Sequence, residues 1–225
     1  SHLTHWRFPH AASYTPSPAS HPHTLRLTPS RLNLTALNGN YAGPSGQTFV
    51  ARRQQHTLFT FSATLDFTPE KEGEEAGVTA FLTQNHHLDI GVVLLPRGSA
   101  GTFPSLPGLA TEGGKEGELV PHVRFRGESY VPVPKAVAYA LPKGWIGGKL
   151  VLEVRAGNAS HYVFGVGPEG RRSERREVMV VGNEGVSWGF TGTLLGIYAT
   201  TNGGNGSTPA YFSDWRYTPI EQFRD

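Results

Sequence analysis

Apolar and polar residues alternate along much of this chain. The clearest stretch runs from Phe59 to Phe67, where every second residue is apolar and the residues between are Thr, Ser, Thr and Asp. A period of two places the apolar side chains on one face of an extended strand and the polar ones on the other. The segment is therefore predicted to be a half-buried β-strand.

The same pattern predicts many further strands. Alternating apolar positions recur at 88–94 and 150–154, and shorter candidates are Thr24–Thr28, Thr48–Arg53, Gly77–Thr83, His122–Arg126, His161–Val166, Glu177–Val181, Thr193–Thr200 and Ala210–Thr218. Clusters of Gly, Asn and Pro separate them, and no long stretch has a helical period of 3.6. Many short strands, each with one buried and one solvent-exposed face, predict an all-β fold, a two-sheet antiparallel β-sandwich.

The chain is predicted to form a single β-sandwich domain over residues 23–225, with a leader or linker arm at residues 1–22. The arm is rich in Pro, Ser and His and lacks periodicity. Gly98–Glu118 contains Gly, Pro and small residues, which predicts a long loop. An all-β chain of 225 residues fits one domain and is long enough to bury a core without disulfides.

Composition excludes several classes of protein. The formal net charge is +2, from 20 Lys and Arg against 18 Asp and Glu, which argues against nucleic acid as a partner. No apolar run is long enough to span a membrane. Cys is absent, which excludes disulfides, thiolate metal sites and a Cys nucleophile. Three N-glycosylation triplets, at Asn33, Asn158 and Asn205, favour a secreted, extracellular protein.

The sequence carries no recognisable catalytic motif. A glycosidase needs two carboxyl groups flanking the scissile bond, but the acidic residues fall in polar contexts, and Glu70–Glu75 is predicted to be a solvated acidic turn. His87 and Asp89 share one face of a strand. This pair allows two interpretations: a metal site, or more simply the solvent-exposed start of a strand. The basic run 171–176 is predicted to be a polar loop or an interface patch.

Aromatic residues, 11% of the chain, provide the candidates for ligand binding. Flat aromatic rings stack on the apolar C–H faces of sugars, while polar groups at the rim bond the hydroxyls. The candidates are Trp145, Trp188, Phe190, Tyr198 and Tyr130. Trp145 lies in a predicted loop, where exposure is expected. Asp214 is the candidate ligand of a structural Ca²⁺, because calcium takes carboxylate and carbonyl oxygens.

Several sequence strings resemble a known family. They are TFVARRQ at 48–54, LDF at 65–67, EEAGVT at 74–79, NHHLDIG at 85–91, FTGTLLGIYAT at 190–200 and SDWRY at 213–217. In this order and spacing they resemble the C-terminal concanavalin A-like domain of glycoside hydrolase family 43 β-xylosidases, which is also classed as carbohydrate-binding module family 91. The resemblance covers about residues 23–218, and Ser30–Thr35 leading into Gln47–Gln54 is similar to filamentous-fungal members.

This resemblance implies a jelly-roll-like sandwich that follows a five-bladed catalytic propeller. The propeller of the family hydrolyses xylosides or arabinofuranosides and holds the catalytic carboxylates, so no catalytic residue is implied in this chain. Phe190, just before Thr191 and Gly192, occupies the place of an aromatic residue that helps to close the propeller's active-site pocket. The resemblance also implies affinity for xylan or xylo-oligosaccharides, and no required cofactor.

We therefore expect a non-catalytic accessory module that binds β-1,4-xylan or arabinoxylan. Two alternatives stay open. The first is a docking domain that completes the propeller's active site without sugar affinity of its own. The second is a sandwich that cleaves glycans itself, which would require two carboxylates converging in a groove.

Overall fold

The computed structural model describes residues 2–36, 46–109 and 114–223. Within these ranges the chain forms β-strands and short 3₁₀ turns. The strands are β1 (Tyr14–Pro16), β2 (Leu25–Leu27), β3 (Thr48–Arg53), β4 (Leu58–Asp66), β5 (Glu75–Thr83), β6 (His86–Pro96), β7 (Thr102–Phe103), β8 (Leu119–Glu128), β9 (Val137–Ala140), β10 (Leu150–Ala156), β11 (His161–Pro168), β12 (Arg176–Gly182), β13 (Leu194–Thr200) and β14 (Ala210–Glu221). The 3₁₀ turns are η1 (Ala11–Ser13), η2 (Lys143–Trp145), η3 (Arg172–Glu174) and η4 (Asn183–Gly185). Every strand that the sequence predicted is present, whereas β1, β7 and β9 were not predicted.

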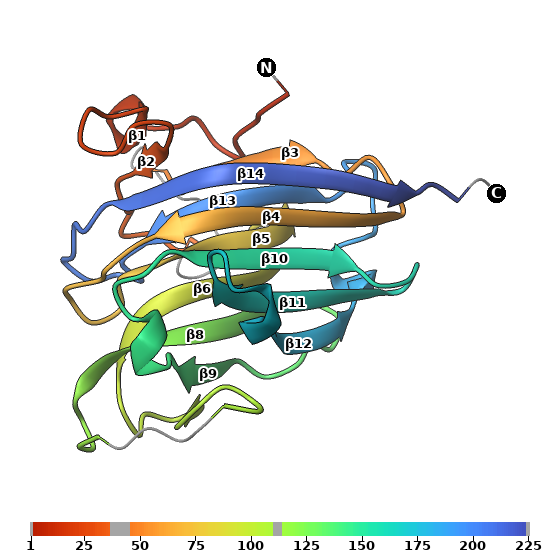
Figure 1. Ribbon diagram of the computed structural model, residues 1–225. Helices are drawn as coiled ribbons and strands as arrows, with labels where there is room; N and C mark the ends of the chain where they lie inside the picture. Colours follow the sequence, from red (N-terminus) through yellow and green to blue (C-terminus); the bar gives the residue numbers. More distant parts are fainter. Residues whose placement is uncertain (1, 37–45, 110–113, 224–225) are drawn as a thin grey trace.

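Two seven-stranded sheets pack face to face (Figure 1). The first has the order β1-β2-β14-β4-β10-β11-β12, and the second has the order β3-β13-β5-β6-β8-β9-β7. Strand pairing is antiparallel except between β7 and β9, which are parallel. This architecture confirms the predicted concanavalin A-like β-sandwich. No helix in the described part of the chain is long and apolar enough to cross a bilayer.

The main core lies between the two sheets and follows from the period-two pattern. In β4, Phe59, Phe61, Ala63 and Leu65 are buried, while the residues between them face outward. They meet the inward side chains of β10, β11 and the second sheet in one continuous cluster. Full burial of one Phe or Leu side chain contributes about 1.5–3 kcal/mol, so this face accounts for the position of β4.

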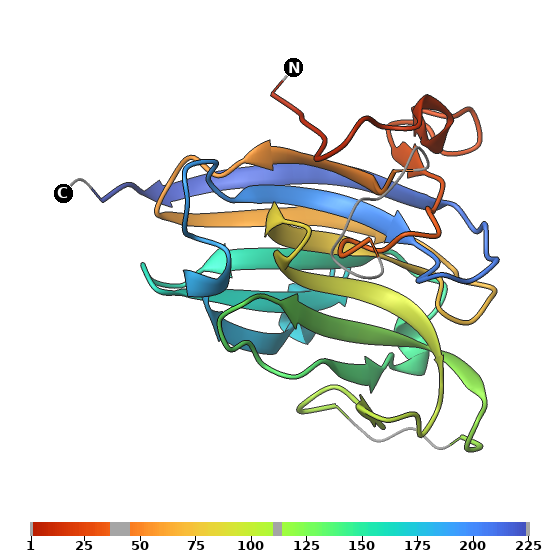
Figure 2. The same ribbon diagram turned by 180° about the vertical axis from the view of Figure 1, so that it is seen from behind.

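A second, smaller core covers the outer face of the second sheet. Its buried members come from β3, β5, β13 and the segment before β3: Leu34, Phe49, Ala51, Phe81, Leu194 and Tyr198, with Trp6 packed against them. Figure 2 shows this side of the molecule, with the N-terminal segments beside β3 and β13. The central strands of the second sheet are therefore buried on both faces.

The predicted arm, residues 1–22, is joined to both sheets. Thr4 exchanges two backbone hydrogen bonds with Ala51 of β3, at 2.7 and 2.9 Å. β1 pairs with β2 at the edge of the first sheet. The Tyr14 hydroxyl donates to the carbonyl oxygen of Phe49 at 3.1 Å, and burial raises the pKa of Tyr14 to about 12. The arm is therefore packed on the sandwich rather than extended from it.

The predicted long loop, Gly98–Glu118, contributes to the sandwich through its described residues. β7 lies within it and pairs with β9, and Leu106 is buried in the main core. The loop is closed at its base, where the Arg97 amide donates to the Glu118 carbonyl at 2.8 Å. Residues 110–113 of this loop lie outside the described part of the chain.

Candidate functional site

One end of the sandwich is built from the loops that connect strands of both sheets. The β3–β4, β5–β6, β8–β9, β10–β11 and β12–β13 connections lie there, beside the end of β14 (Figure 1, right-hand side). We refer to this surface as the loop end; it comprises residues 54–57, 84–85, 129–136, 157–160, 183–193 and 222–223. Because the strands are antiparallel, residues far apart in sequence meet at this surface.

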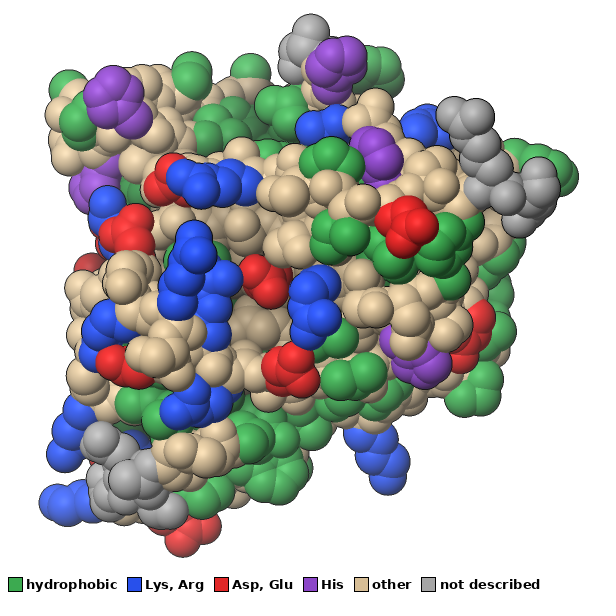
Figure 3. All heavy atoms as spheres, turned by 45° about the vertical axis from the view of Figure 1, so that its right-hand side comes forward, with side chains coloured by type: hydrophobic (Ala, Val, Ile, Leu, Met, Phe, Trp, Pro, Cys, Tyr) green, Lys and Arg blue, Asp and Glu red, His purple; other side chains and the backbone are tan. Residues whose placement is uncertain are grey.

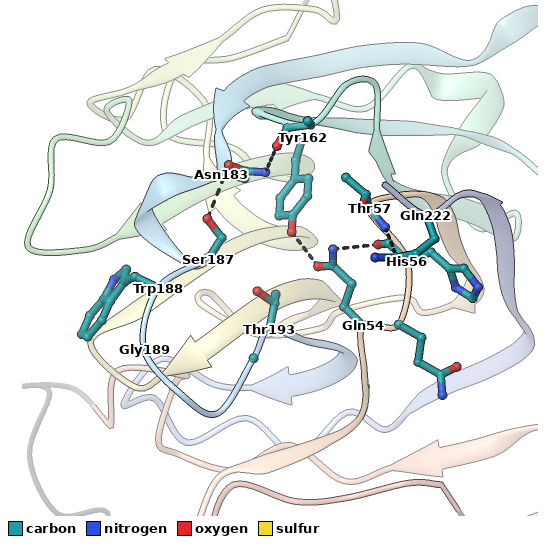
Figure 4. A pocket seen from close by; sticks show the side chains of 13 residues that line it. Gln54, His56, Thr57, Tyr162, Asn183, Ser187, Trp188, Gly189, Thr193 and Gln222 are labelled. Atoms are coloured by element: carbon teal, nitrogen blue, oxygen red, sulfur yellow. Dashed lines mark hydrogen bonds between the residues drawn. The ribbon is translucent and has the colours of Figure 1, made fainter. Parts of the chain in front are cut away.

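A pocket of about 400 Å³ opens on the loop end (Figure 4). This volume lies within the range of small-molecule sites. Its lining comes from three of the connections, from β11 and from the chain after β14: Gln54, Gln55, His56, Thr57, Ala159, Tyr162, Asn183, Ser187, Trp188, Gly189, Gly192, Thr193 and Gln222.

Hydrogen bonds fix the floor of the pocket. The Tyr162 hydroxyl donates to Oε1 of Gln54 at 2.7 Å, and Nε2 of Gln54 donates to the carbonyl oxygen of His56 at 3.0 Å. Both ends of the Gln54 amide are thus engaged, which sets the side-chain orientation seen in Figure 4. Tyr162 is 1% exposed, and its burial raises the pKa of the phenol to about 12, so it stays a neutral donor.

The walls of the pocket are held in the same way. Nδ2 of Asn183 donates to the carbonyl oxygen of Ala159 at 2.9 Å, which ties the β12–β13 loop to the β10–β11 hairpin. On the other side, the amide of Thr57 donates to Oε1 of Gln222 at 3.1 Å. The amide side chains of the walls are therefore oriented by the backbone before any ligand arrives.

None of the described residues that line the pocket is Asp, Glu, Lys or Arg. The lining consists of amides, hydroxyls, one imidazole, one indole and small residues. Such a surface can donate and accept hydrogen bonds but has no acidic side chain for a metal ion and no Lys or Arg for a phosphate or a carboxylate. Its chemistry therefore suits a neutral, hydroxyl-rich ligand with an apolar face.

Three of the five predicted aromatic residues are exposed on the loop end. Trp188 lines the pocket and is 47% exposed, and Tyr130 is 79% exposed. Phe190 lies between Gly189 and Gly192, both with positive φ, and its side chain is fully exposed. The structure thus places Trp188 in the pocket wall, Tyr130 elsewhere on the loop end, and Phe190 on the same loop as Trp188.

The other two predicted aromatic residues are buried, which corrects the expectation that Trp145 is exposed in its loop. Trp145 is 2% exposed in η2, and its Nε1 donates to Oε2 of Glu174 at 3.0 Å. Tyr198 of β13 has no exposed surface and donates to Oε1 of Glu75 at 2.9 Å. Stacking on a sugar needs an open ring face, and neither side chain has one.

Residues 2–218 match a protein family described as "Beta xylosidase C-terminal Concanavalin A-like domain". The chain belongs to this family. The family resemblance seen in the sequence is thereby confirmed, and its boundary extends into the arm, as the packing of residues 4–16 on the sandwich also indicates.

Relatives of this β-xylosidase C-terminal domain include full-length glycoside hydrolases. Over 200 residues the chain is 28% identical to the non-reducing end alpha-L-arabinofuranosidase BoGH43B of Bacteroides ovatus, covering 85% of this chain and 31% of the relative. The chain therefore spans about a third of the length of that curated relative.

Solved structures share the fold. The glycoside hydrolase family 43 protein BlXynB of Bacillus licheniformis, in its K247S mutant, superposes with a TM-score of 0.68 at 20% identity, covering 95% of this chain and 36% of that chain. A functionally unknown protein of Saccharomyces cerevisiae superposes with a TM-score of 0.55 at 12% identity, covering 93% of this chain and 97% of that one. The second match shows that a similar sandwich can make up almost a whole chain.

In this β-xylosidase C-terminal domain, four acidic and His residues that the sequence placed in solvent are buried. Glu74 and Glu75 are 0% and 1% exposed, and His87 and Asp89 are 0% and 1% exposed. The solvated strand start was therefore a wrong prediction, and the solvated acidic turn was wrong for Glu74 and Glu75 but right for the exposed Glu70 and Glu72. Glu75, His87 and Asp89 are enclosed because the outer face of the second sheet is covered. Glu74 is enclosed beside the β13–β14 loop, where Thr208 bonds its carboxylate.

Each buried carboxylate has cationic or hydrogen-bonding partners. Glu75 pairs with Arg124, and Asp89 accepts hydrogen bonds from Nδ1 of His87 at 2.9 and 3.0 Å and pairs with Arg126 at 3.4 Å. Burial alone raises a carboxyl pKa, but these partners outweigh it and lower the pKa of both Glu75 and Asp89. Both groups are ionised and enclosed at neutral pH.

Asp214 does not have the surroundings of a calcium ligand. Its carboxylate is 53% exposed and lies 3.7 Å from the Arg216 guanidinium. No group of three or more His, Cys, Asp or Glu that could hold a metal ion occurs within the described ranges. One carboxylate beside a guanidinium does not fit the six to eight oxygen ligands that Ca²⁺ takes.

The glycosylation candidates differ in accessibility. Asn158 and Asn205 are exposed, and Asn158 sits in the β10–β11 hairpin beside the pocket. Asn33 is partly buried and accepts a hydrogen bond from the Thr35 hydroxyl at 2.6 Å. Glycan attachment at these positions stays a prediction.

Two arginines of the basic run 171–176 pair with neighbouring acids. Arg171 pairs with Glu174 at 2.9 Å, and Arg175 pairs with Glu153 of β10 at 3.1 Å. Figure 3 shows basic and acidic side chains interspersed over this side of the molecule rather than gathered by sign. The run is therefore a polar loop, as one of the two sequence interpretations held.

Sequence reasoning did not find the polar lining of the pocket. Gln54 and Asn183 come from two separate connections, Gln222 follows β14, and none of them belongs to a motif. The only local signal was the pair of glycines around Trp188 and Phe190, which indicates a loop rather than a core strand.

Proposed function

We propose that this domain is the non-catalytic accessory part of a secreted glycoside hydrolase and that its loop end binds a neutral β-1,4-xylan or arabinoxylan chain. The observation that carries the proposal is the uncharged pocket of about 400 Å³ with the half-exposed ring of Trp188 in its wall. An indole supplies the apolar surface for a sugar ring, and the oriented amides supply partners for its hydroxyls. Xylan is the neutral polymer that fits the enzymes to which the chain is related.

The pocket is open, so the affinity of the isolated domain is expected to be modest. Only part of each sugar unit is buried in an open site, and ordering the oligosaccharide opposes binding. The hydrogen bonds that orient the amides of Gln54 and Asn183 lower that cost on the protein side. A ligand with several linked sugar units is therefore the appropriate probe.

Docking on a catalytic domain is the second candidate function, and Phe190 favours it. A fully exposed Phe on a loop with two positive-φ glycines gains nothing from folding of this domain alone. Its ring becomes useful when a partner covers it or when it closes a neighbouring substrate pocket. Leu3 and Phe8 of the arm, 47% and 96% exposed, add apolar surface where a preceding domain would connect.

Glycan cleavage by this chain alone receives no support from its buried carboxylates. A glycosidase uses one carboxyl group of raised pKa as the acid and leaves both groups open to substrate. Glu75 and Asp89 have lowered pKa values and are each 1% exposed. Their paired guanidinium groups explain them as structural charges.

Calorimetric titration of the chain with xylohexaose tests the proposal. We expect saturable heat with xylohexaose, weaker heat with cellohexaose and no new reducing ends in the same mixture. Trp188→Ala should weaken binding about tenfold, the effect of removing an aromatic anchor. Phe103→Ala is the matched control, because this residue is also half-exposed, at 44%, but lies on β7 away from the loop end. Flat heat with xylohexaose would leave docking as the function of the domain, and release of reducing ends would establish catalysis instead.

A further inference from the structure

Trp188 has few structural constraints of its own. It follows the short turn η4, precedes Gly189 with a φ of +79°, and lies in a segment without β-pairing. Its side chain is 47% exposed, yet it forms a wall of the pocket. A free indole in such a loop would sample several rotamers and would have to be ordered when a ligand binds.

His86 supplies the missing constraint. Its ring lies edge-on to the Trp188 ring, with the centroids 4.6 Å apart and the planes at 89°. The same imidazole meets the ring of Tyr130 at 4.5 Å and 85°. One buried side chain, 2% exposed, therefore contacts two exposed aromatic residues of the loop end.

A hydrogen-bond relay fixes the orientation of His86. The Ser129 hydroxyl donates to the carbonyl oxygen of Gly185 at 3.2 Å, so it accepts the proton of Nδ1 of His86, at 2.9 Å. This relay links β6, the β8–β9 loop and the turn that precedes Trp188. Burial lowers the pKa of His86, which keeps its ring neutral at pH 7.

The base of His86 is also fixed. The two residues before it form the β5–β6 turn, and each holds another segment. Oε1 of Gln84 accepts hydrogen bonds from Trp6 at 3.2 Å and Arg7 at 3.3 Å, and Nδ2 of Asn85 donates to the Tyr130 hydroxyl at 3.0 Å. Three consecutive side chains thus tie the arm, the β8–β9 loop and the β12–β13 loop to one turn.

We propose that His86 is a positioning residue that holds the Trp188 ring in the pocket wall through edge-on packing, with Ser129 anchoring the imidazole. This role rests on the proposed function, because Trp188 is useful in the wall only if the pocket binds a glycan. His86 itself does not line the pocket and acts through Trp188.

Acrylamide quenching of Trp188 fluorescence tests this role without any ligand. The chain has four Trp residues, so the emission of Trp188 must be separated from that of the other three. For the wild type and for each variant, the fluorescence of the same protein carrying Trp188→Phe is subtracted at every acrylamide concentration. In His86→Gln, which loses the ring, the quenching constant of Trp188 should rise up to about twofold, because the indole is already 47% exposed. Ser129→Ala keeps the ring but removes its anchor, and it should give a smaller rise.

His122→Gln is the matched control. His122 is also buried, at 1%, but it lies on β8 and bonds the carbonyl oxygen of Val120 instead of any group at the loop end. It should leave the quenching of Trp188 unchanged. The proposal is overturned if His86→Gln and Ser129→Ala both quench like the wild-type chain, or if His122→Gln raises quenching as much as they do.

Xylohexaose titration of the same variants separates this role from the proposed function. His86→Gln should weaken binding about threefold to tenfold, the cost of ordering one side chain on binding. If quenching rises while affinity stays unchanged, His86 positions Trp188 but Trp188 does not contact the sugar, and the proposed function fails at that residue. Should His86→Gln not fold, the Ser129→Ala result decides the proposal alone.

Discussion

Replacing Glu74 by Gln should strongly destabilise the domain, although the change removes only one charge. Glu74 lies at the end of the sandwich opposite the pocket and has no exposed surface. Its Oε2 accepts hydrogen bonds from the amides of Glu70 (2.7 Å) and Lys71 (3.0 Å) and from the Thr208 hydroxyl (2.7 Å). Its Oε1 accepts from the Thr208 amide at 2.8 Å. One carboxylate thus ties the β4–β5 turn to the β13–β14 loop.

A Gln side chain cannot satisfy these donors, because one of its two terminal groups is itself a donor. In its better orientation the Gln amide nitrogen takes the place of Oε1 and faces the Thr208 N–H, so these two donors meet and neither has an acceptor. The other three hydrogen bonds, from Glu70, Lys71 and the Thr208 hydroxyl, remain but are made to a neutral oxygen instead of a charged one. The sum is a loss of about 3 kcal/mol in the free energy of unfolding. For a domain of this size, that corresponds to a fall of about 6–12 °C in Tm.

The effect should depend on pH. Burial raises the pKa of Glu74, but the hydrogen bonds from Thr208, Lys71 and Glu70 outweigh it, so the net pKa lies below the ordinary value of 4.5. A carboxyl group with a lowered folded-state pKa stabilises the protein above its unfolded pKa and loses that contribution as the pH falls through the folded pKa. The gap between wild type and Glu74→Gln should therefore be full at pH 7 and shrink below pH 4.5.

Urea unfolding followed by tryptophan fluorescence, at pH 7 and below pH 4.5, measures both the loss in unfolding free energy and its dependence on pH. Glu72→Gln is the control, because Glu72 lies in the same turn but is exposed. If Glu74→Gln and Glu72→Gln unfold at the same urea concentration at pH 7, the four hydrogen bonds do not carry the stability assigned to them here.

Two further substitutions test the packing of the second sheet and the exposure of the aromatic loop. Gly91→Ala should cost about 1–3 kcal/mol in urea unfolding, because its Cβ would lie 2.6 Å from the Tyr198 hydroxyl, whereas Gly144→Ala, with open space around it, should unfold like wild type. Phe190→Ala should leave the urea midpoint of the isolated chain unchanged, since its side chain is fully exposed. A drop in the midpoint of Phe190→Ala would mean that the ring packs on this domain and is not available to a partner.

The period-two pattern was sufficient to predict every strand of the first sheet except the three-residue β1, because these strands have one buried and one solvent-exposed face. In β4 the apolar residues Phe59, Phe61, Ala63 and Leu65 are all buried, and of the alternating hydroxyl residues only Thr64 is buried as well. The strands β7 and β9 were missed because one is two residues long and the other follows a Pro-rich segment.

The second sheet could be predicted only in part, because its outer face is covered by residues that are distant in sequence. A polar residue such as Asp89 then looks solvated in the sequence but is buried with Arg126 and His87. For the same reason Tyr198 could not be told from a surface aromatic residue. Contacts that form only when the arm and Leu34 fold over the sheet have no local signal.

The site shows the same limit. Trp188 and Phe190 were named as candidates because they are aromatic, but the polar lining of the pocket comes from three connections, β11 and the chain after β14. Trp145 was misplaced because its Gly-rich surroundings predict a loop, while the indole itself turns inward to the Glu174 carboxylate. Residue type and spacing identify loops, whereas the direction of a loop side chain depends on the tertiary structure.

The central claim is that the loop end is the glycan-binding surface, and amide chemical-shift mapping of the ¹⁵N-labelled chain with xylohexaose tests it most directly. The account predicts saturable shifts at residues 54–57, 159–162 and 183–193, with the Trp188 indole N–H among the largest. No shifts, or shifts confined to the outer face of either sheet, would contradict it.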